Sequence, residues 1–289
     1  MKKNLQNFFY AALLVLATFS TFSCSNDERV DSYMMDENHI ELQGEDNMRD
    51  LGGYVGAENK RVLYHKLFRS GDLSGLTSSD LKHLSTKNIY QIFDLRTTQE
   101  RKEKKDMVIT GALYYELSLL DDSNSVANGG TTDSNDVIGL ILSGKVNAKD
   151  VMFPVYTMDE IKIAQWTKIF DLLESGQTTL WHCTAGKDRA GMTTALVLYS
   201  LGVDKKDIIE DFMKSNDYLA VSNQQTISYI NSQYGAGAGE KLIPLLGVEE
   251  DYITTFFNDI ESQYGTVDDF LVEILKVNTD KMKKNFLEK

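Results

Sequence analysis

The chain has 289 residues, 42% of them hydrophobic, which is enough to bury one large core. Its 43 acidic residues outnumber its 30 basic ones, for a formal net charge of −13. This charge argues against nucleic-acid binding and against broad electrostatic attraction to phospholipid surfaces. The only two prolines, Pro154 and Pro244, form no linker between domains. We therefore expect a single domain over residues 39–289.

The first 24 residues have the pattern of an export signal. Two lysines precede an apolar run over residues 8–19, which is too short for a membrane-spanning helix of about 20 residues. The run ends in Phe22-Ser-Cys24, which resembles a bacterial lipoprotein cleavage box with Cys24 lipidated; an ordinary signal peptide cut nearby is the alternative. Residues 25–38 are polar and acidic, which predicts a tether. We expect a bacterial cell-envelope protein, periplasmic or surface-exposed, that contacts the membrane through a lipid anchor only.

The first half of the mature chain predicts several short strands and a helix. Residues 39–42 and 61–68 predict short strands, with a turn at Gly52-Gly53 between them. A capping box at Thr77–Asp80 predicts a helix over residues 78–86. Residues 89–95 then predict a buried strand.

From residue 111 onward, one strand is predicted first and most of the later segments are helical by pattern. Residues 111–120 predict a strand, and residues 121–136 form a long polar loop of the kind that often acts as a lid. This insert either covers a pocket or is ordinary scaffold. The segments with helical spacing are 137–142, 153–174 (with a core stripe of Ile161, Trp166, Ile169 and Leu173), 205–214, 221–234, 248–263 and 267–277.

Residues 179–201 combine a β-prone run, a loop of small residues and an apolar, helix-forming segment. Strand, tight loop and helix form the context in which backbone N–H groups bind phosphate, and Gly186 can adopt the positive φ that turns amides inward. Cys183 begins the loop beside a helix N-terminus, which favours the thiolate. Arg189 ends it, and its planar guanidinium can hold two phosphoryl oxygens. We predict a nucleophile aimed at phosphorus, with a buried structural cysteine as the alternative. The predicted phosphate-binding residues are Thr184, Ala185, Gly186, Lys187, Asp188 and Arg189.

The cysteine and histidine counts agree with this interpretation. The chain has two cysteines, so with Cys24 lipidated Cys183 would be a lone thiol without a disulfide partner. A metal site is not expected, because the three histidines outside the loop lack ligand-like spacing. These are His39, His65 and His83.

The stretch His182-Cys-Thr-Ala-Gly-Lys-Asp-Arg-Ala-Gly191 resembles the signature of cysteine-dependent protein tyrosine phosphatases. It is most similar to the bacterial family with an Ala-Gly-Lys-Asp-Arg loop, whose members act on phosphotyrosine, phosphoserine/threonine and phosphoinositides. Further matching segments are 47–54, 67–71, Asp94-Leu-Arg96 with Glu100, and 211–216, and the resemblance spans about residues 38–289. It implies an α/β fold with a mostly parallel central sheet flanked by helices, with lid-like helical insertions. It also implies hydrolysis through a phosphocysteine without cofactor or metal, on a phosphorylated protein, phosphoinositide or inositol phosphate.

Two carboxylates are candidates for the general acid that protonates the leaving oxygen. Asp94 is the first choice, because it ends an expected strand and α/β folds place their chemistry there. Its alternative role is to hold Arg96 or Arg189. Asp188, inside the loop, is the rival, and the sequence does not rank the two.

Three cations are candidates for the substrate pocket. Lys187 places a second positive charge near the loop, or is a solvated surface charge. The resemblance makes Arg49 and Arg69 pocket candidates, and a salt bridge to a structural aspartate is the alternative for each.

One position departs from the family pattern. The residue after the loop arginine is usually Ser or Thr, whose hydroxyl donates to the departing thiolate, but here it is Ala190. We expect slower breakdown of the phosphocysteine unless Thr193, Thr184 or water substitutes. A catalytically weak, envelope-anchored phosphate-recognition module is therefore the alternative function.

Overall fold

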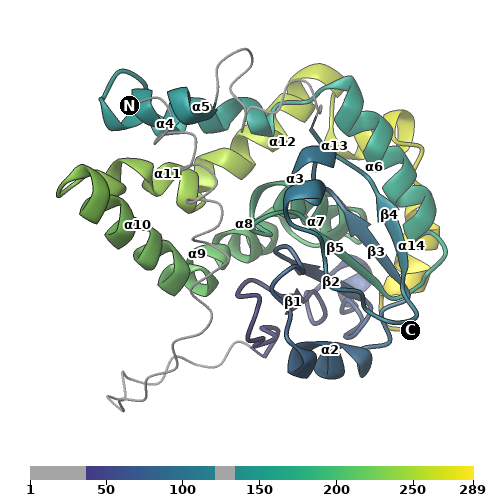
Figure 1. Cartoon of the computed structure of the whole chain (residues 1–289). Helices are drawn as coiled ribbons and strands as arrows, with labels where there is room; N and C mark the ends of the chain where they lie inside the picture. The colour runs from purple at the N-terminus through teal and green to yellow at the C-terminus, as the bar shows by residue number, and fades with distance from the viewer. Residues whose placement is uncertain (1–36, 121–133) are drawn as a thin grey trace.

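A five-stranded sheet forms the centre of the computed structural model, which describes residues 37–120 and 134–289 (Figure 1). Its strand order is β1-β2-β5-β3-β4; β1 is antiparallel to β2, and the other three pairings are parallel. The predicted mostly parallel sheet is thereby confirmed. The strands are β1 (Arg49–Asp50), β2 (Leu67–Ser70), β3 (Gln91–Asp94), β4 (Leu113–Glu116) and β5 (Thr179–His182).

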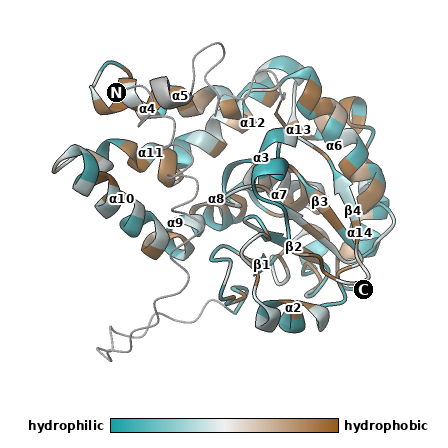
Figure 2. Ribbon diagram, in the orientation of Figure 1, coloured by the Kyte–Doolittle hydropathy of each residue, from teal (hydrophilic) through white to brown (hydrophobic). Residues whose placement is uncertain are grey.

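Apolar side chains cover both faces of this sheet. One face carries Leu67, Phe93 and Trp181, and the other carries Phe68, Ile92 and Leu180, as strand alternation requires. The first face packs against most of the helices, whose apolar stripes are visible in Figure 2, and the second against α2 (Ser78–Ser85). Helices on the first face are α6 (Glu160–Leu173), α7 (Asp188–Ser200), α8 (Lys205–Met213), α12 (Glu250–Tyr264), α13 (Val267–Asp269), the π-helix η5 (Phe270–Ile274) and α14 (Thr279–Phe286).

A group of helices beside the sheet has its own small apolar cluster (Figure 1). Ile141, Ile230 and Leu242 lie at its centre. The predicted helical insertions are therefore present, while their role as a lid stays a prediction. The group comprises α4 (Ser134–Leu142), α5 (Ala148–Met152), α10 (Ala220–Tyr234), η4 (Gly239–Leu242) and α11 (Ile243–Leu246). The remaining short elements are η1 (Ala57–Asn59), α3 (Thr98–Glu103), η3 (Phe153–Tyr156) and α9 (Ser215–Tyr218).

Several predicted boundaries need correction. Residues 39–42 contribute an isolated bridge from His39 to Arg49 rather than a strand. Over 61–68 the chain is interrupted at His65, whose φ is 61° and whose N–H donates to Asp50 at 2.7 Å, so the strand begins only at Leu67. The helix predicted over 153–174 is split, because Asp159 caps a new helix.

The signal segment 1–24, the tether up to residue 36 and the polar segment 121–133 lie outside the described residues. Residues 134–136, expected in the polar loop, begin helix α4 instead. Within the described ranges, no helix combines the length and apolarity needed to cross a membrane.

Candidate active site

The predicted strand, loop and helix are confirmed around Cys183. Strand β5 ends at His182, and α7 begins at Asp188, four residues before the predicted apolar segment, so Arg189 lies in the first helical turn. Gly186 has φ of +70°, and a Cβ there would lie 2.4 Å from the carbonyl of Ser70. Only glycine fits this turn, which brings the free N–H groups of the helix start toward the loop.

Cys183 lies at the floor of this loop. Its thiol is free and 2% exposed, and it belongs to the apolar cluster that contains Trp181 and Ala190. Alternation along β5 places Cys183 on the same side of the sheet as Trp181, opposite to His182. The sulfur is therefore shielded from bulk water while it faces the start of α7.

Arg189 forms a two-pronged pair with Glu100 at the front of the loop. Its Nη1 and Nη2 donate to Glu100 Oε2 and Oε1 at 2.6 and 2.7 Å, and Thr184 Oγ1 donates to Oε1 at 2.6 Å. Burial opposes both charges, but the pair and its hydrogen bonds outweigh it, so the pKa of Glu100 is lowered and that of Arg189 is raised. Arg189 is thus a permanent cation whose fork is oriented before any ligand binds.

A second arginine cluster lies behind the loop. Asp211 accepts from Arg49 Nε at 3.0 Å and from Arg69 Nη1 at 2.7 Å, and all three side chains are buried. Arg69 Nη2 also donates to the carbonyls of Gly186 and Lys187 at 2.7 and 3.1 Å. The two arginines predicted as pocket candidates are therefore held beneath the loop by Asp211, which corresponds to the salt-bridge alternative.

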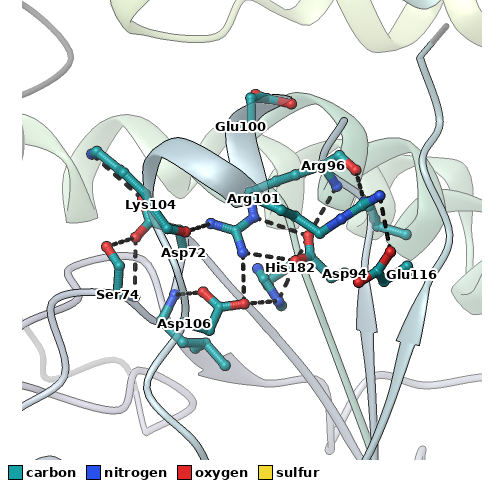
Figure 3. Close-up of polar contacts among 12 residues, drawn as sticks. Asp72, Ser74, Asp94, Arg96, Glu100, Arg101, Lys104, Asp106, Glu116 and His182 are labelled. Atoms are coloured by element: carbon teal, nitrogen blue, oxygen red, sulfur yellow. Dashed lines mark hydrogen bonds and ion pairs between the residues drawn. The ribbon is translucent and has the colours of Figure 1, made fainter. Parts of the chain in front are cut away.

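Asp94 belongs to a charged network with Arg96, Asp106 and His182 (Figure 3). Asp94 lies beside His182 in the sheet register, so alternation places it on the opposite side from Cys183. Arg96 donates to both of its oxygens, at 2.9 and 2.7 Å, and also to Asp106 at 2.6 Å. Burial would raise the pKa of Asp94, but the Arg96 hydrogen bonds and the charge of His182 lower it. Asp94 is therefore an ionised partner of Arg96, which corresponds to its structural alternative.

His182 joins this network to the loop. Its Nε2 lies 3.3 Å from Asp106 Oδ2, and its Nδ1 donates to the carbonyl of Cys183 at 3.3 Å. Burial would lower its pKa, yet Asp106 and Asp94 raise it, so the protonated imidazole is favoured beside the nucleophile. Asp94, Asp106 and His182 are close enough together to ligate a metal ion, but Arg96 already occupies both carboxylates.

Asp188 lies at the loop mouth with different partners. Tyr156 Oη donates to its Oδ1, and Lys187 Nζ lies 3.0 Å from its Oδ2. Burial and the charge of Asp188 raise the pKa of Tyr156, which keeps that hydroxyl a donor. The Asp188 side chain keeps 18% exposure and follows the loop directly, so its carboxyl can reach a bound ligand.

Both threonines that could replace the missing hydroxyl of Ala190 are engaged elsewhere. Thr184 Oγ1 donates to Glu100, and Thr193 Oγ1 donates to the carbonyl of Arg189 at 3.0 Å while accepting from Trp166. A hydroxyl has a single proton to donate. Neither proton is thus directed at Cys183 in this arrangement.

Glu100, Asp211 and Tyr156 are the site residues to which the sequence interpretation gave no role, although Glu100 and Asp211 belong to segments that match the family. A local signal existed for Glu100, because Thr97 and Glu100 form a capping box that starts α3 directly after β3. For Asp211 and Tyr156 no local pattern indicated a partner, since Asp211 accepts from Arg69 across 142 residues and Tyr156 donates to Asp188 across 32.

The comparisons with known proteins show the family of the chain. Residues 40–288 match the profile of the Tyrosine phosphatase family, so the chain belongs to that family. A Cupriavidus necator protein assigned as a tyrosine-protein phosphatase is 28% identical over 245 residues, which cover 83% of this chain and 85% of that protein. The triple specificity protein phosphatase PtpB of Mycobacterium tuberculosis is 24% identical over 260 residues, 80% of this chain and 92% of PtpB. Among solved structures, the match to TpbA of P. aeruginosa covers 63% of this chain and 89% of the TpbA chain, with 14% sequence identity and a TM-score of 0.32.

Proposed function

We propose that the protein hydrolyses phosphomonoesters, foremost phosphotyrosine, through a phosphocysteine at Cys183. The observation that carries this proposal is the joint placement of the thiol, the start of α7 and the preoriented Arg189 around one loop. The Cys183 sulfur attacks phosphorus and forms the S–P bond as the ester P–O bond breaks. Arg189 and the loop N–H groups bind the equatorial oxygens, where they stabilise the charge of the transition state.

Asp188 is the proposed general acid. A general acid must carry a proton at working pH and reach the leaving oxygen. Asp94 fails the second condition, because Arg96 holds its carboxylate and alternation along β3 and β5 points it away from Cys183. Asp188 remains at the loop mouth, with Tyr156 and Lys187 orienting its carboxyl. In the second step Asp188 takes a proton from the water whose oxygen bonds to phosphorus. The S–P bond then breaks, which releases inorganic phosphate and regenerates the Cys183 thiolate.

A leaving-group series tests this assignment. Asp188→Asn is expected to lower kcat by about 10²–10⁴-fold on phenyl phosphate, whose leaving group needs a proton, and far less on 2,4-dinitrophenyl phosphate. Asp94→Asn disturbs the Arg96 network and should lower both rates to a similar extent. The reverse pattern would make Asp94 the acid.

The arrangement of the threonines favours one alternative, an envelope-anchored phosphate-recognition module with poor turnover. It rests on Ala190 and on the Thr184 and Thr193 protons being directed elsewhere. Steady-state hydrolysis of p-nitrophenyl phosphate in reducing buffer distinguishes the two functions. Absent hydrolysis, together with phosphate binding that Arg189→Ala abolishes, would support the module.

We further propose that Cys24 carries a lipid that anchors the protein in the bacterial cell envelope. This proposal rests on the sequence of residues 1–24 alone, which lie outside the described ranges. Labelling of cells with a radioactive fatty acid should mark the wild-type protein and leave Cys24→Ala unmarked. Equal labelling of both would exclude this anchor.

A further inference from the structure

A cavity of about 170 Å³ adjoins the mouth of the phosphate loop. The loop contributes Thr184, Ala185 and Lys187 to its wall. Two leucines of α11, Leu245 and Leu246, form an apolar side. A group attached to a phosphate in the loop would therefore enter this cavity next.

The opposite side of the cavity is acidic. Glu45, Asp46 and Asp72 line it, together with Lys104. The cavity's two lysines are both committed to carboxylates, Lys104 to Asp72 at 3.7 Å and Lys187 to Asp188 at 3.0 Å. Lys187 also donates to the carbonyl of Gly247 at 3.0 Å. The cavity wall thus retains negative charge at Asp46, and Glu45 adds to it when ionised.

Glu45 carries a buried oxygen that lacks a partner among the described residues. Its Oε1 accepts from the N–H groups of Gly71 and Asn47 at 2.6 and 2.9 Å, whereas Oε2 has no hydrogen bond. The side chain is only 7% exposed. A buried carboxyl oxygen without a donor costs free energy, which a ligand donor in the cavity would recover.

The charges around Glu45 also favour a cationic ligand in this cavity. Burial raises the pKa of Glu45 to about 7, and the charges of Asp46 and Asp72 raise it further against the two backbone hydrogen bonds. The charges of Asp46 and Asp72, which favour a proton on Glu45, equally favour a cationic group near it, and that group would in turn favour the ionised form of Glu45. The same two charges disfavour a second phosphate at this place.

We propose that this cavity is a subsite for a cationic side chain, so that the preferred substrates are phosphotyrosine proteins with an arginine or lysine next to the phosphorylated residue. The inference rests on the proposed function and narrows its substrate class. The guanidinium or ammonium group donates to Glu45 Oε2 and to the exposed carboxylate of Asp46, and its alkyl stem packs against Leu245 and Leu246. Inositol polyphosphates, with several neighbouring anions, fit this wall poorly.

A binding experiment tests the subsite without requiring turnover. Fluorescence anisotropy would give the Kd of three phosphotyrosine peptides that differ only in the following residue, arginine, alanine or glutamate. The full chain carries Cys183→Ser, so that bound peptide is not hydrolysed. We expect the arginine peptide to bind about tenfold tighter than the glutamate peptide, with alanine between them.

Charge variants in the same background locate the effect. Glu45→Gln keeps an acceptor for the two N–H groups, and Asp46→Asn changes an exposed residue, where a substitution is expected to alter stability by less than about 0.5 kcal/mol. Each variant should reduce the preference for the arginine peptide, measured as the ratio of its affinity to that of the glutamate peptide, about threefold. The matched exposed control Asp171→Asn should leave this ratio unchanged. Equal affinity for the three peptides, a preference for glutamate, or an unchanged ratio in both variants would overturn the proposal. Hydrolysis of p-nitrophenyl phosphate by the wild-type chain tests the proposed function separately.

Discussion

The phosphate loop has arginines on two sides, and the two sides are built differently. At the mouth, one arginine faces one carboxylate, Arg189 with Glu100, and the side chains keep 9% and 20% exposure. Behind the loop, Arg49 and Arg69 share the single carboxylate of Asp211, and their exposures are 0%, 0% and 1%. The mouth pair is balanced and open to a ligand, whereas the rear cluster is closed and carries an excess positive charge.

This difference assigns distinct tasks to the two sides. The mouth pair is less buried than the rear cluster, so the oxygens of a phosphate can replace those of Glu100 on Arg189. Arg189 can therefore serve the substrate. A fully buried cluster cannot rearrange, because any unpaired charge in it costs several kcal/mol. Arg69 instead fixes the Gly186 and Lys187 carbonyls, and the excess charge behind the loop favours an anion in front of it.

The largest expected effect is on the rear cluster. Asp211→Asn leaves two buried arginines without their counter-charge, and we expect it to lower the free energy of unfolding by about 3–5 kcal/mol. Glu100→Gln at the mouth should cost only about 1 kcal/mol, because its pair is partly exposed to solvent. Urea unfolding monitored by circular dichroism measures both. Similar losses in the two variants would mean that the mouth is as rigidly built as the rear.

Glu45 sharpens the comparison, because it is a buried carboxylate without an arginine. The charges of Arg49 and Arg69 overcome burial and lower the pKa of Asp211 to about 2, while burial raises that of Glu45 from 4.5 to about 7. The folded state therefore holds a proton that the unfolded state releases above about pH 4.5, and this stabilisation is lost as the pH rises through 7. The loss amounts to about 3 kcal/mol.

Glu45→Gln, which does not ionise, should remove this pH dependence. Relative to the wild type, its unfolding free energy is expected to rise by about 2–3 kcal/mol between about pH 4 and about pH 8. Urea midpoints across that range measure the difference. If wild type and variant followed parallel pH curves, the pKa of Glu45 would not differ between the folded and unfolded states, and burial would not raise it.

The smallest expected effect concerns Ala190, which follows Arg189 in the first turn of α7. Ala190→Ser restores a hydroxyl at the start of α7, and we expect it to speed phosphocysteine breakdown about tenfold. Rapid-quench kinetics of p-nitrophenyl phosphate would show a smaller burst and a faster steady state. Ala195→Ser, another buried alanine of α7, is the matched control. An unchanged breakdown rate would show that another group already protects the leaving thiolate.

The sequence alone predicted the loop, because its strand, turn and helix are contiguous and each has a local cause. The positive φ at Gly186 and the strand ending at Asp94 are likewise local properties. The partners are not local. Arg189 meets Glu100 across 89 residues and Arg69 meets Asp211 across 142, so no spacing rule connects them.

Asp94 shows why position along a strand does not fix a role. Its place at the C-terminal end of β3 was predicted correctly, beside His182 in β5. The direction of its side chain depends on which face of the sheet it shares with Arg96 and Asp106, and this follows only from the three-dimensional register. The start of the strand predicted over 61–68 was wrong for a similar reason. The chain is interrupted at His65, whose N–H donates to the distant Asp50.

The most direct test of the account is to trap the covalent intermediate. The wild-type chain would be mixed with excess 2,4-dinitrophenyl phosphate, quenched in acid within milliseconds, digested and examined by mass spectrometry. The account predicts a phosphoryl group on the peptide that contains Cys183, and none in the Cys183→Ser variant. Turnover without a phosphorylated Cys183 peptide, or the same label in the variant, would contradict it.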